Sequence, residues 1–295
     1  MGLPHVTAVV RPSTLDEALA LIRNGGGAAR WLAGGIDVVR RPPAAETTLI
    51  DLSALPLGDI SVSRDGDAVS IGAMASLTEI QESPLIRELY AGEIVSMLGA
   101  VASPLLRNLA TLGGSIGSAH PWSDIHCLLL AIGAHVEIYD GATRTADLGE
   151  VLPVHSGENQ QLVTRILLPL PKEHTAAAFE KFARSKFDVA MLNCACWISL
   201  SSGKVAKARI VAGGTPARAS RVPTAEKQIL GTTLDEATIS AAAETAVRDT
   251  ELREDVRASA EYRATLLATG VRRCLVRARA SLALGDTSDL EKGRP

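Results

Sequence analysis

The chain has 295 residues, a net charge of −3 from 30 lysines and arginines against 33 aspartates and glutamates, and only 3% aromatic residues. Balanced charge and scarce aromatic rings argue against a nucleic-acid surface, and no apolar run has the length of a transmembrane helix. The N-terminal residues lack the pattern of a signal peptide, so we expect a cytoplasmic protein.

The N-terminal segment predicts a strand, a helix, a second strand and a glycine loop. Residues 6–10 have the composition of a strand, and Thr14 followed three positions later by Glu17 is a capping-box pattern. A short strand at 29–33 leads into the glycine pair at 34–35. This order is typical of a small α/β unit.

The middle of the chain mixes strands and helices. Alternating apolar and polar residues at 60–63 and 68–71 indicate a β-hairpin. Residues 86–102 predict one or two helices, ended by a proline. The stretch 110–124 is rich in small residues, has no lysine or arginine, and is expected to form a loop.

After this expected loop the pattern predicts an apolar helix at 125–132 and strands at 135–139 and 162–168, while the polar segment 147–161 has no clear assignment. A run of strands and then helices follows. They are expected at 179–183, 189–200, 206–212, 224–230, 234–250 and 262–284.

These elements predict an α+β protein of two domains. The first spans residues 1–173, in two parts at 1–55 and 56–173. The second spans residues 174–284, an antiparallel sheet followed by helices. A polar tail, expected to be frayed, occupies residues 285–295.

No two of the four cysteines form a C-x-x-C motif, so we expect neither a zinc site nor an iron–sulfur site within the chain. Cys194 and Cys196 alternate within an apolar segment and would share one face of a strand. They are interpreted as buried thiols of the core.

Two glycine pairs, at 34–35 and 113–114, carry the strongest indication of function. Glycines flanked by hydroxyl groups let backbone N–H groups approach an anion closely. Each pair alone is more often a tight turn, and neither fits the dinucleotide or P-loop pattern, which argues against a nucleotide hydrolase. Together they suggest one large phosphate-bearing ligand held from two sides.

The order and spacing of six motifs resembles the FAD-binding subunit of molybdenum hydroxylases, the family of xanthine dehydrogenase, carbon monoxide dehydrogenase and aldehyde oxidoreductase. The resemblance runs from His5 to about Ala280. The most specific motif is the second glycine stretch with its Pro-x-x-Asp. The motifs are LAGGID at 32–37, LRNLATLGGS at 106–115, PWSD at 121–124, EKFAR at 180–184, DVA at 188–190 and AGGTP at 212–216.

The resemblance implies a vanillyl-alcohol-oxidase-type FAD domain in two parts, followed by a C-terminal α+β domain. FAD would be bound non-covalently, with the two glycine stretches on its diphosphate. No residue of this chain would act as a catalytic acid, base or nucleophile, and none would bind a metal. The implied cofactor-binding residues are Leu32, Ala33, Gly34, Gly35, Ile36, Asp37, Val101, Thr111, Gly113, Gly114, Ser115, Ser118, Asp124, Leu162 and Lys181.

Three of these residues have individual roles in the implied site. Asp124 would accept hydrogen bonds from the ribityl hydroxyls, Leu162 would pack on the isoalloxazine ring, and Lys181 would lie near its pyrimidine edge, where a cation stabilises the reduced flavin. Without the resemblance, Asp124 reads as a helix N-cap, Leu162 as a core residue and Lys181 as a surface amine.

The chain departs from the family pattern at three positions. Ser115 stands where the family usually has Asn, Ile36 replaces a threonine, and His120 replaces a small residue before the proline. The polar segment 147–161 is also shorter than the family loop beside the flavin. These changes leave the contacts at Ile36 and Ser115 open.

The resemblance implies an electron-transfer subunit. A large molybdenum-cofactor subunit would oxidise the substrate, a small subunit with two [2Fe–2S] clusters would relay electrons to the FAD, and an external acceptor would take them. The assembly would be a dimer of heterotrimers. Two alternatives remain open: a stand-alone FAD-dependent oxidoreductase of the same fold, and a flavin-free scaffold subunit.

Overall fold

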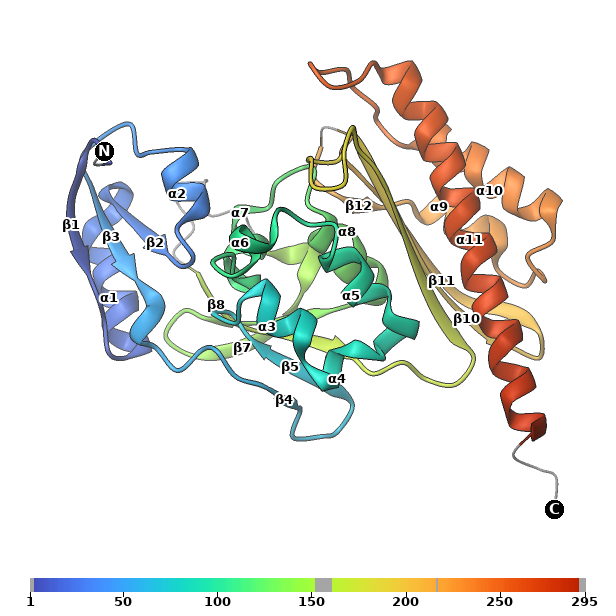
Figure 1. Ribbon diagram of the computed structural model, residues 1–295, viewed down its shortest axis with the longest axis horizontal. Coiled ribbons are helices and arrows are strands. Elements are labelled where there is room, and N and C mark those ends of the chain that lie inside the picture. Colours follow the sequence, from blue (N-terminus) through green and yellow to red (C-terminus); the bar gives the residue numbers. More distant parts are fainter. Residues whose placement is uncertain (1–2, 152–160, 216, 292–295) are drawn as a thin grey trace. The chain divides into compact units, whose positions relative to one another are not determined.

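The computed structural model describes residues 3–151, 161–215 and 217–291, and contacts divide the chain into two compact units (Figure 1). Unit 1 comprises Met1–Leu85, Ala102–Ala119 and Ala134–Leu168; unit 2 comprises Ile86–Val101, His120–Gly133 and Pro169–Pro295. The units are interleaved along the sequence. The predicted domains are consecutive segments that meet at residue 173, so they do not correspond to these two units. The predicted domain boundary therefore stays a prediction.

Unit 1 begins with the expected α/β unit. Its three strands are parallel, in the order β1-β3-β2, and Thr14 caps the first helix by accepting a hydrogen bond from the Glu17 amide. Glu17 in turn accepts from the Ser13 amide, one residue before the expected position. The elements are β1 (Val6–Val10), α1 (Leu15–Gly25), β2 (Ala29–Leu32), α2 (Ile36–Arg40) and β3 (Thr47–Asp51).

The rest of unit 1 is built on a five-stranded sheet of order β4-β5-β8-β6-β7. The expected hairpin is confirmed, because β4 and β5 pair antiparallel. The strands are β4 (Ile60–Val62), β5 (Ala68–Gly72), β6 (His135–Tyr139), β7 (Thr143–Asp147) and β8 (Leu162–Pro169). Helices α3 (Leu77–Glu82), α6 (Pro104–Arg107) and α7 (Leu112–Ser118) complete the unit, and α4 (Pro84–Arg87) lies at its edge.

Unit 2 contains an antiparallel sheet of order β12-β11-β10-β9 with helices against it (Figure 1). The strands are β9 (Thr175–Phe182), β10 (Leu192–Ser201), β11 (Lys204–Gly213) and β12 (Ser220–Arg221). The helices are α5 (Glu93–Leu98), α8 (Asp124–Ile132), α9 (Pro223–Ile229), α10 (Glu236–Asp249) and α11 (Ala260–Glu291).

Strand β10 separates two layers of unit 2. Side chains alternate between the faces of a strand, so Leu192, Cys194, Cys196 and Ile198 share one face, where they join the apolar core formed with α9, α10 and α11. Asn193, on the opposite face, contacts α8. The sheet is therefore covered on both faces, and its middle strand is buried.

The cysteines are buried thiols, as expected from the sequence. All four are free and fully buried. Cys194 and Cys196 point toward α11, where the Cys274 Sγ lies 3.9 Å from that of Cys194. No helix in the described part of the chain is long and apolar enough to span a membrane.

Two expectations about local structure are wrong. The glycine stretch expected as a loop contains helix α7, because Thr111 caps it and the glycines fit a tight helix contact. The tail expected to be frayed from residue 285 begins as helix, since α11 continues to Glu291. No proline interrupts that extension.

Candidate cofactor-binding site

The first glycine pair lies in unit 1, between β2 and the short helix α2. Gly35 has φ +74° and is the N-cap of α2. Gly34 lies so close to the chain at residue 109 that an added Cβ would be 1.8 Å from the Leu109 carbonyl oxygen. Both positions therefore require glycine, one for its conformation and the other for its lack of a side chain.

Backbone donors are open at this first pair. In the part of the chain that the structure describes, no protein acceptor is recorded for the amides of Gly34, Gly35 and Ile36. The carbonyl of Gly35 is used inside the protein, because it accepts from the Val39 amide 3.0 Å away. The three open N–H groups at a helix start form a donor set that suits an anion.

The second glycine pair forms the first turn of α7, and its amides are already occupied. The Thr111 hydroxyl caps the helix by accepting from the Gly114 amide at 3.1 Å. The first four amides of α7, those of residues 112–115, all donate within the protein, to Ala75 O, Ala73 O, Thr111 Oγ1 and Thr111 O in that order. These four amides are therefore not free to bind an anion, contrary to the expectation for this glycine pair.

Close packing explains the glycine at position 113. An added Cβ would lie 2.5 Å from the Cβ of Ala73 and 2.8 Å from its carbonyl oxygen. The hydroxyls of Ser115 and Ser118 turn back onto their own helix, donating to Thr111 O at 2.9 Å and Gly114 O at 2.6 Å. Their lone pairs remain as acceptors.

The two glycine segments lie side by side within unit 1. A Cβ added at Gly114 would be 3.6 Å from the Cβ of Ala33, and Gly34 abuts the residues just before α7. The structure thus brings together segments about 80 positions apart in sequence. In the second segment, the amides of the glycine pair and of its two neighbours, residues 112–115, are occupied by protein acceptors.

In unit 2, Asp124 and Lys181 form a buried ion pair. The Lys181 Nζ lies 2.8 Å from the Asp124 Oδ2, and the two side chains are 10% and 5% exposed. Lys181 also donates to the Ala100 carbonyl at 2.8 Å, which places it beside Val101, the neighbouring residue in the chain. The reading of Lys181 as a surface amine is therefore wrong.

The sequence did not single out a third member of this cluster, Asn193. Its side-chain amide donates to the Asp124 Oδ1 at 2.7 Å and to the Trp122 carbonyl at 3.3 Å. Asn193 is fully buried. A signal was available, because a lone amide within an apolar strand needs a hydrogen-bond partner in the core.

Electrostatics at Asp124 reflect its burial. Loss of solvent raises the pKa of the Asp124 carboxyl above its ordinary value, while the Lys181 ammonium and the Asn193 amide act to lower it. Asp124 is the first residue of α8, where the helix dipole favours a negative charge. The N-cap itself is Ser123, not Asp124, because the Ser123 hydroxyl accepts from the His126 amide.

Leu162 lies in an apolar core. It is 3% exposed and clusters with residues of α1 and β3 in unit 1. Its surroundings support the reading of a core strand residue that the sequence left open.

His120 lies on the loop before Asp124 and is held by aromatic contacts. Its ring stacks on that of Trp122, with centroids 4.8 Å apart and planes 8° from parallel. The Arg257 guanidinium lies over the same Trp122 ring at 5.0 Å. This stack fixes the loop that leads into α8. Of the polar segment 147–161, which is shorter than the family loop beside the flavin, the structure describes residues 147–151 and 161.

Comparison with protein families gives two matches that together cover most of the chain. Residues 5–171 match the model described as the FAD binding domain in molybdopterin dehydrogenase. Residues 177–278 match the CO dehydrogenase flavoprotein C-terminal domain.

Individual relatives agree with these matches. The chain is 31% identical to the carbon monoxide dehydrogenase medium chain of Afipia carboxidovorans, over 92% of this chain and 96% of that one. It is 30% identical to the 6-hydroxypseudooxynicotine dehydrogenase complex subunit alpha of Paenarthrobacter nicotinovorans, over 94% and 96%. Among solved structures, a chain of carbon monoxide dehydrogenase from Hydrogenophaga pseudoflava is similar with a TM-score of 0.88 and 29% identity, covering 95% of this chain and 99% of that one.

Proposed function

The chain belongs to the family of FAD-binding subunits of molybdopterin dehydrogenases, and on that premise we propose how its own residues hold the cofactor. It has the two-part FAD-binding domain and C-terminal flavoprotein domain of that family. It is the FAD-binding medium subunit of an oxidoreductase, with a role in electron transfer. When bound, the isoalloxazine ring supplies the redox chemistry.

The open amides at the first glycine pair carry the proposal. The N–H groups of Gly34, Gly35 and Ile36 bind the cofactor's diphosphate, since they are the donors for which no acceptor is recorded in the described residues. Backbone amides need no side-chain hydroxyl for this contact. The replacement of the family's threonine by Ile36 is therefore compatible with FAD binding. Leu32, Ala33 and Asp37 flank these amides and complete the segment.

The second glycine segment has a different part in the proposal. Its glycines hold α7 against Ala73, and this contact positions the first pair beside it. Thr111, Ser115 and Ser118 offer hydroxyl lone pairs to the cofactor rather than amides, because the amides at the start of α7 are in use. Ser115 can act in this way although it is shorter than the asparagine usual in the family.

Asp124 and Lys181 act as a pair on the ribityl chain and the ring. A carboxylate has about four lone-pair positions, and Lys181 and Asn193 use one on each oxygen, which leaves acceptors for hydroxyl groups. An ammonium carries three N–H groups, and those toward Asp124 and Ala100 account for two. The third serves the polar edge of the ring. Val101 and Leu162 remain proposed contacts of the cofactor because of the resemblance to the family alone.

The relatives named above are subunits of multi-subunit enzymes, as their names state. By analogy we assign to this chain a large molybdenum-cofactor partner and a small [2Fe–2S] partner, assembled as a dimer of heterotrimers. Its task in that complex is to hold FAD between the clusters and an external acceptor. No general acid or base is assigned to this chain.

The proposal is tested by measuring FAD in the purified protein and in two variants. Flavin released by denaturation is quantified for wild type, Asp124→Ala and the control Cys194→Ala, whose thiol is equally buried but faces α11. We expect non-covalent FAD in wild type and a larger loss in Asp124→Ala. Equal retention in both variants would remove Asp124 from the site. A wild-type protein that cannot be loaded with FAD favours the scaffold alternative, and a single chain that turns over substrate alone favours the stand-alone enzyme.

A further inference from the structure

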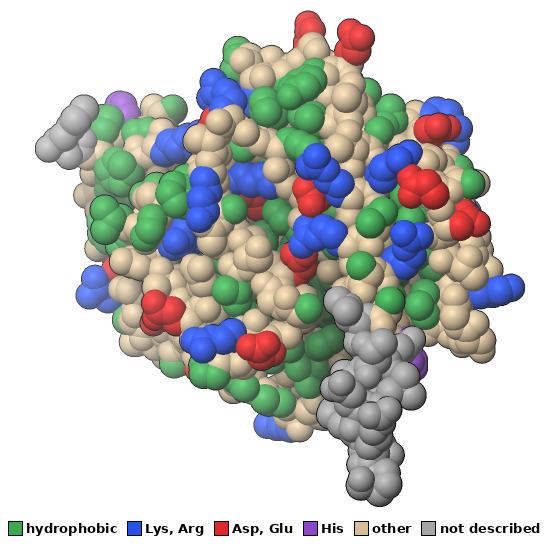
Figure 2. All heavy atoms as spheres, turned by 45° about the vertical axis from the view of Figure 1, so that its right-hand side comes forward, with side chains coloured by type: hydrophobic (Ala, Val, Ile, Leu, Met, Phe, Trp, Pro, Cys, Tyr) green, Lys and Arg blue, Asp and Glu red, His purple; other side chains and the backbone are tan. Residues whose placement is uncertain are grey.

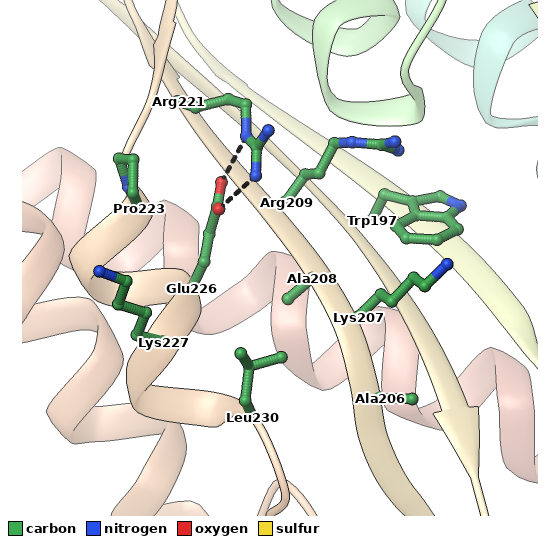
Figure 3. A pocket seen from close by; sticks show the side chains of 10 residues that line it. All are labelled: Trp197, Ala206, Lys207, Ala208, Arg209, Arg221, Pro223, Glu226, Lys227 and Leu230. Atoms are coloured by element: carbon green, nitrogen blue, oxygen red, sulfur yellow. Dashed lines mark hydrogen bonds and ion pairs between the residues drawn. The ribbon is translucent and has the colours of Figure 1, made fainter.

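A groove of about 440 Å³ lies in unit 2, away from the Asp124–Lys181 pair (Figure 3). Its walls come from β10, β11, β12 and helix α9. The groove is distant from the Asp124–Lys181 pair. Trp197, which lines the groove, lies four positions beyond Asn193 on β10, which corresponds to about 13 Å along the strand. The groove is therefore separate from the proposed cofactor contacts of unit 2.

The groove is cationic in a chain whose net charge is negative. Lys207, Arg209, Arg221 and Lys227 line it, against one carboxylate, that of Glu226. On the face drawn in Figure 2, by contrast, lysine and arginine side chains are interspersed with aspartates and glutamates. In the groove, four cationic side chains against one carboxylate give an excess of positive charge.

The single carboxylate is neutralised inside the groove wall. Arg221 forms a bidentate ion pair with Glu226, as Figure 3 shows. Its Nε donates to Oε1 at 2.9 Å and its Nη2 donates to Oε2 at 2.5 Å. The Ile210 amide donates to the same Oε1 at 3.0 Å. Because Arg221 neutralises the buried Glu226, the other cations of the groove keep their excess of positive charge.

Arg209 is also held in place. Its guanidinium lies 4.8 Å from the centre of the Trp197 ring, and its Nη1 donates to the Ala131 carbonyl near the end of α8 at 3.4 Å. A Cβ added at Gly133 would lie 2.7 Å from this guanidinium. Arg209 thus contributes fixed positive charge to the groove while it caps α8.

Lys207 and Lys227 are the adaptable cations. Both are exposed, and no ion pair is recorded for either within the described residues. Figure 3 shows their ammonium groups pointing to opposite sides, with Ala208 and Leu230 between them. Leu230 is 45% exposed and adds an apolar contact at the centre.

From this arrangement we infer that the groove docks an extended acidic segment of a partner subunit, with carboxylates at two separated positions and an apolar side chain between them. The inference rests on the proposed function, since it requires a multi-subunit complex. A single phosphate group fits less well, because the two ammoniums point apart. The most preorganised donors, those of Arg221, are already bound to Glu226.

Carbodiimide cross-linking of the native complex tests the inference, because this reagent joins an amine directly to a carboxylate that contacts it. We expect mass spectrometry to find Lys207 and Lys227 linked to aspartates or glutamates of one partner subunit. Lys204 is the internal control, an exposed lysine on the same strand outside the groove. A complex in which neither groove lysine is linked to a partner overturns the inference and leaves the proposed function intact.

Charge reversal gives an independent measurement. Lys207→Glu with Lys227→Glu should weaken association with the remaining subunits about tenfold or more at low salt, with unchanged FAD content. Lys204→Glu should associate as wild type does. Equal association of the double variant and the control contradicts docking at the groove. Protection of the two lysines from acetylation by inorganic pyrophosphate, in the absence of partners, would replace the acidic segment by a phosphate ligand. A chain that forms no complex at all overturns the docking inference and the assignment of partner subunits, whereas the flavin measurement alone decides the proposed FAD contacts.

Discussion

The carboxylate of Asp124 and the ammonium of Lys181 meet 2.8 Å apart in the interior of unit 2, although 57 positions separate them in sequence. Asp124 begins a helix, whereas Lys181 lies near the end of a strand. Asn193 completes the cluster from the neighbouring strand. A buried pair of this kind is costly to break, because the remaining charge has no solvent to stabilise it.

Removing Lys181 should therefore destabilise the protein strongly. We expect Lys181→Met to lower the free energy of unfolding by about 3–5 kcal/mol, measured by urea denaturation. The double variant with Asp124→Asn should lose less than the sum of the two single losses. The control is Arg184→Ala, which breaks an exposed pair with Asp188 and should leave the free energy of unfolding nearly unchanged, because solvent screens that pair. Additive losses at positions 124 and 181 would show that the pair is not coupled.

Asn193→Asp should strengthen the pH dependence of stability at this cluster, where the raised pKa of Asp124 already makes stability fall as the pH rises. Two carboxyls within hydrogen-bond distance cannot both ionise, so the folded protein retains a proton that the unfolded chain releases near pH 4. The folded state then binds more protons, and its stability falls as the pH rises. Thermal unfolding of this variant and of Asn193→Ala between about pH 5 and pH 8, a range above the ordinary pKa of a carboxyl group, measures the difference. Parallel profiles would contradict the contact with Asp124.

Gly113→Ala should disturb the contact between α7 and Ala73. The added Cβ would lie 2.5 Å from the Ala73 Cβ, so we expect a loss of about 1–3 kcal/mol from overpacking. Gly27→Ala is the matched control, since its added Cβ meets nothing within 4 Å. Chemical denaturation of both variants measures the free energy of unfolding. An unchanged value for Gly113→Ala would mean that α7 shifts freely.

His126 should contribute to acid sensitivity. Burial lowers the pKa of this side chain to about 3, with the nearby Arg218 acting in the same direction. Below about pH 6.5 the unfolded chain therefore binds a proton that the folded chain does not bind. The free energy of unfolding falls as the pH drops from there toward 3, by about 1.4 kcal/mol per pH unit. His126→Gln should flatten this part of the curve of unfolding free energy against pH. An unchanged slope would assign the effect to other groups.

Local signals in the sequence identified most of the elements. Thr14 caps α1, as its spacing from Glu17 indicates, and the alternation at 60–71 forms a hairpin. Strand β7 was missed because four of its five residues are exposed and no apolar alternation marks it. Its pairing with β6 comes from the sheet, not from its own composition.

The candidate site shows the same division. The two glycine pairs were recognisable as special, and the structure places them side by side. The difference in hydrogen bonding between the two pairs was not predictable, because it depends on which carbonyls reach the α7 amides from distant segments, such as those of Ala73 and Ala75. Asn193 was missed for the same reason, since its importance appears only when β10 packs against α8.

Helix α8 links two regions that have been treated separately. Asp124 stands at its first turn, and the Arg209 guanidinium, part of the cationic groove, lies at its last. Nine helical residues span about 13 Å, with hydrogen bonds along the whole length. The helix therefore acts as a rigid spacer of set length within unit 2. A protein seated in the groove has its distance to the carboxylate of Asp124 defined by one short helix and not by a flexible loop.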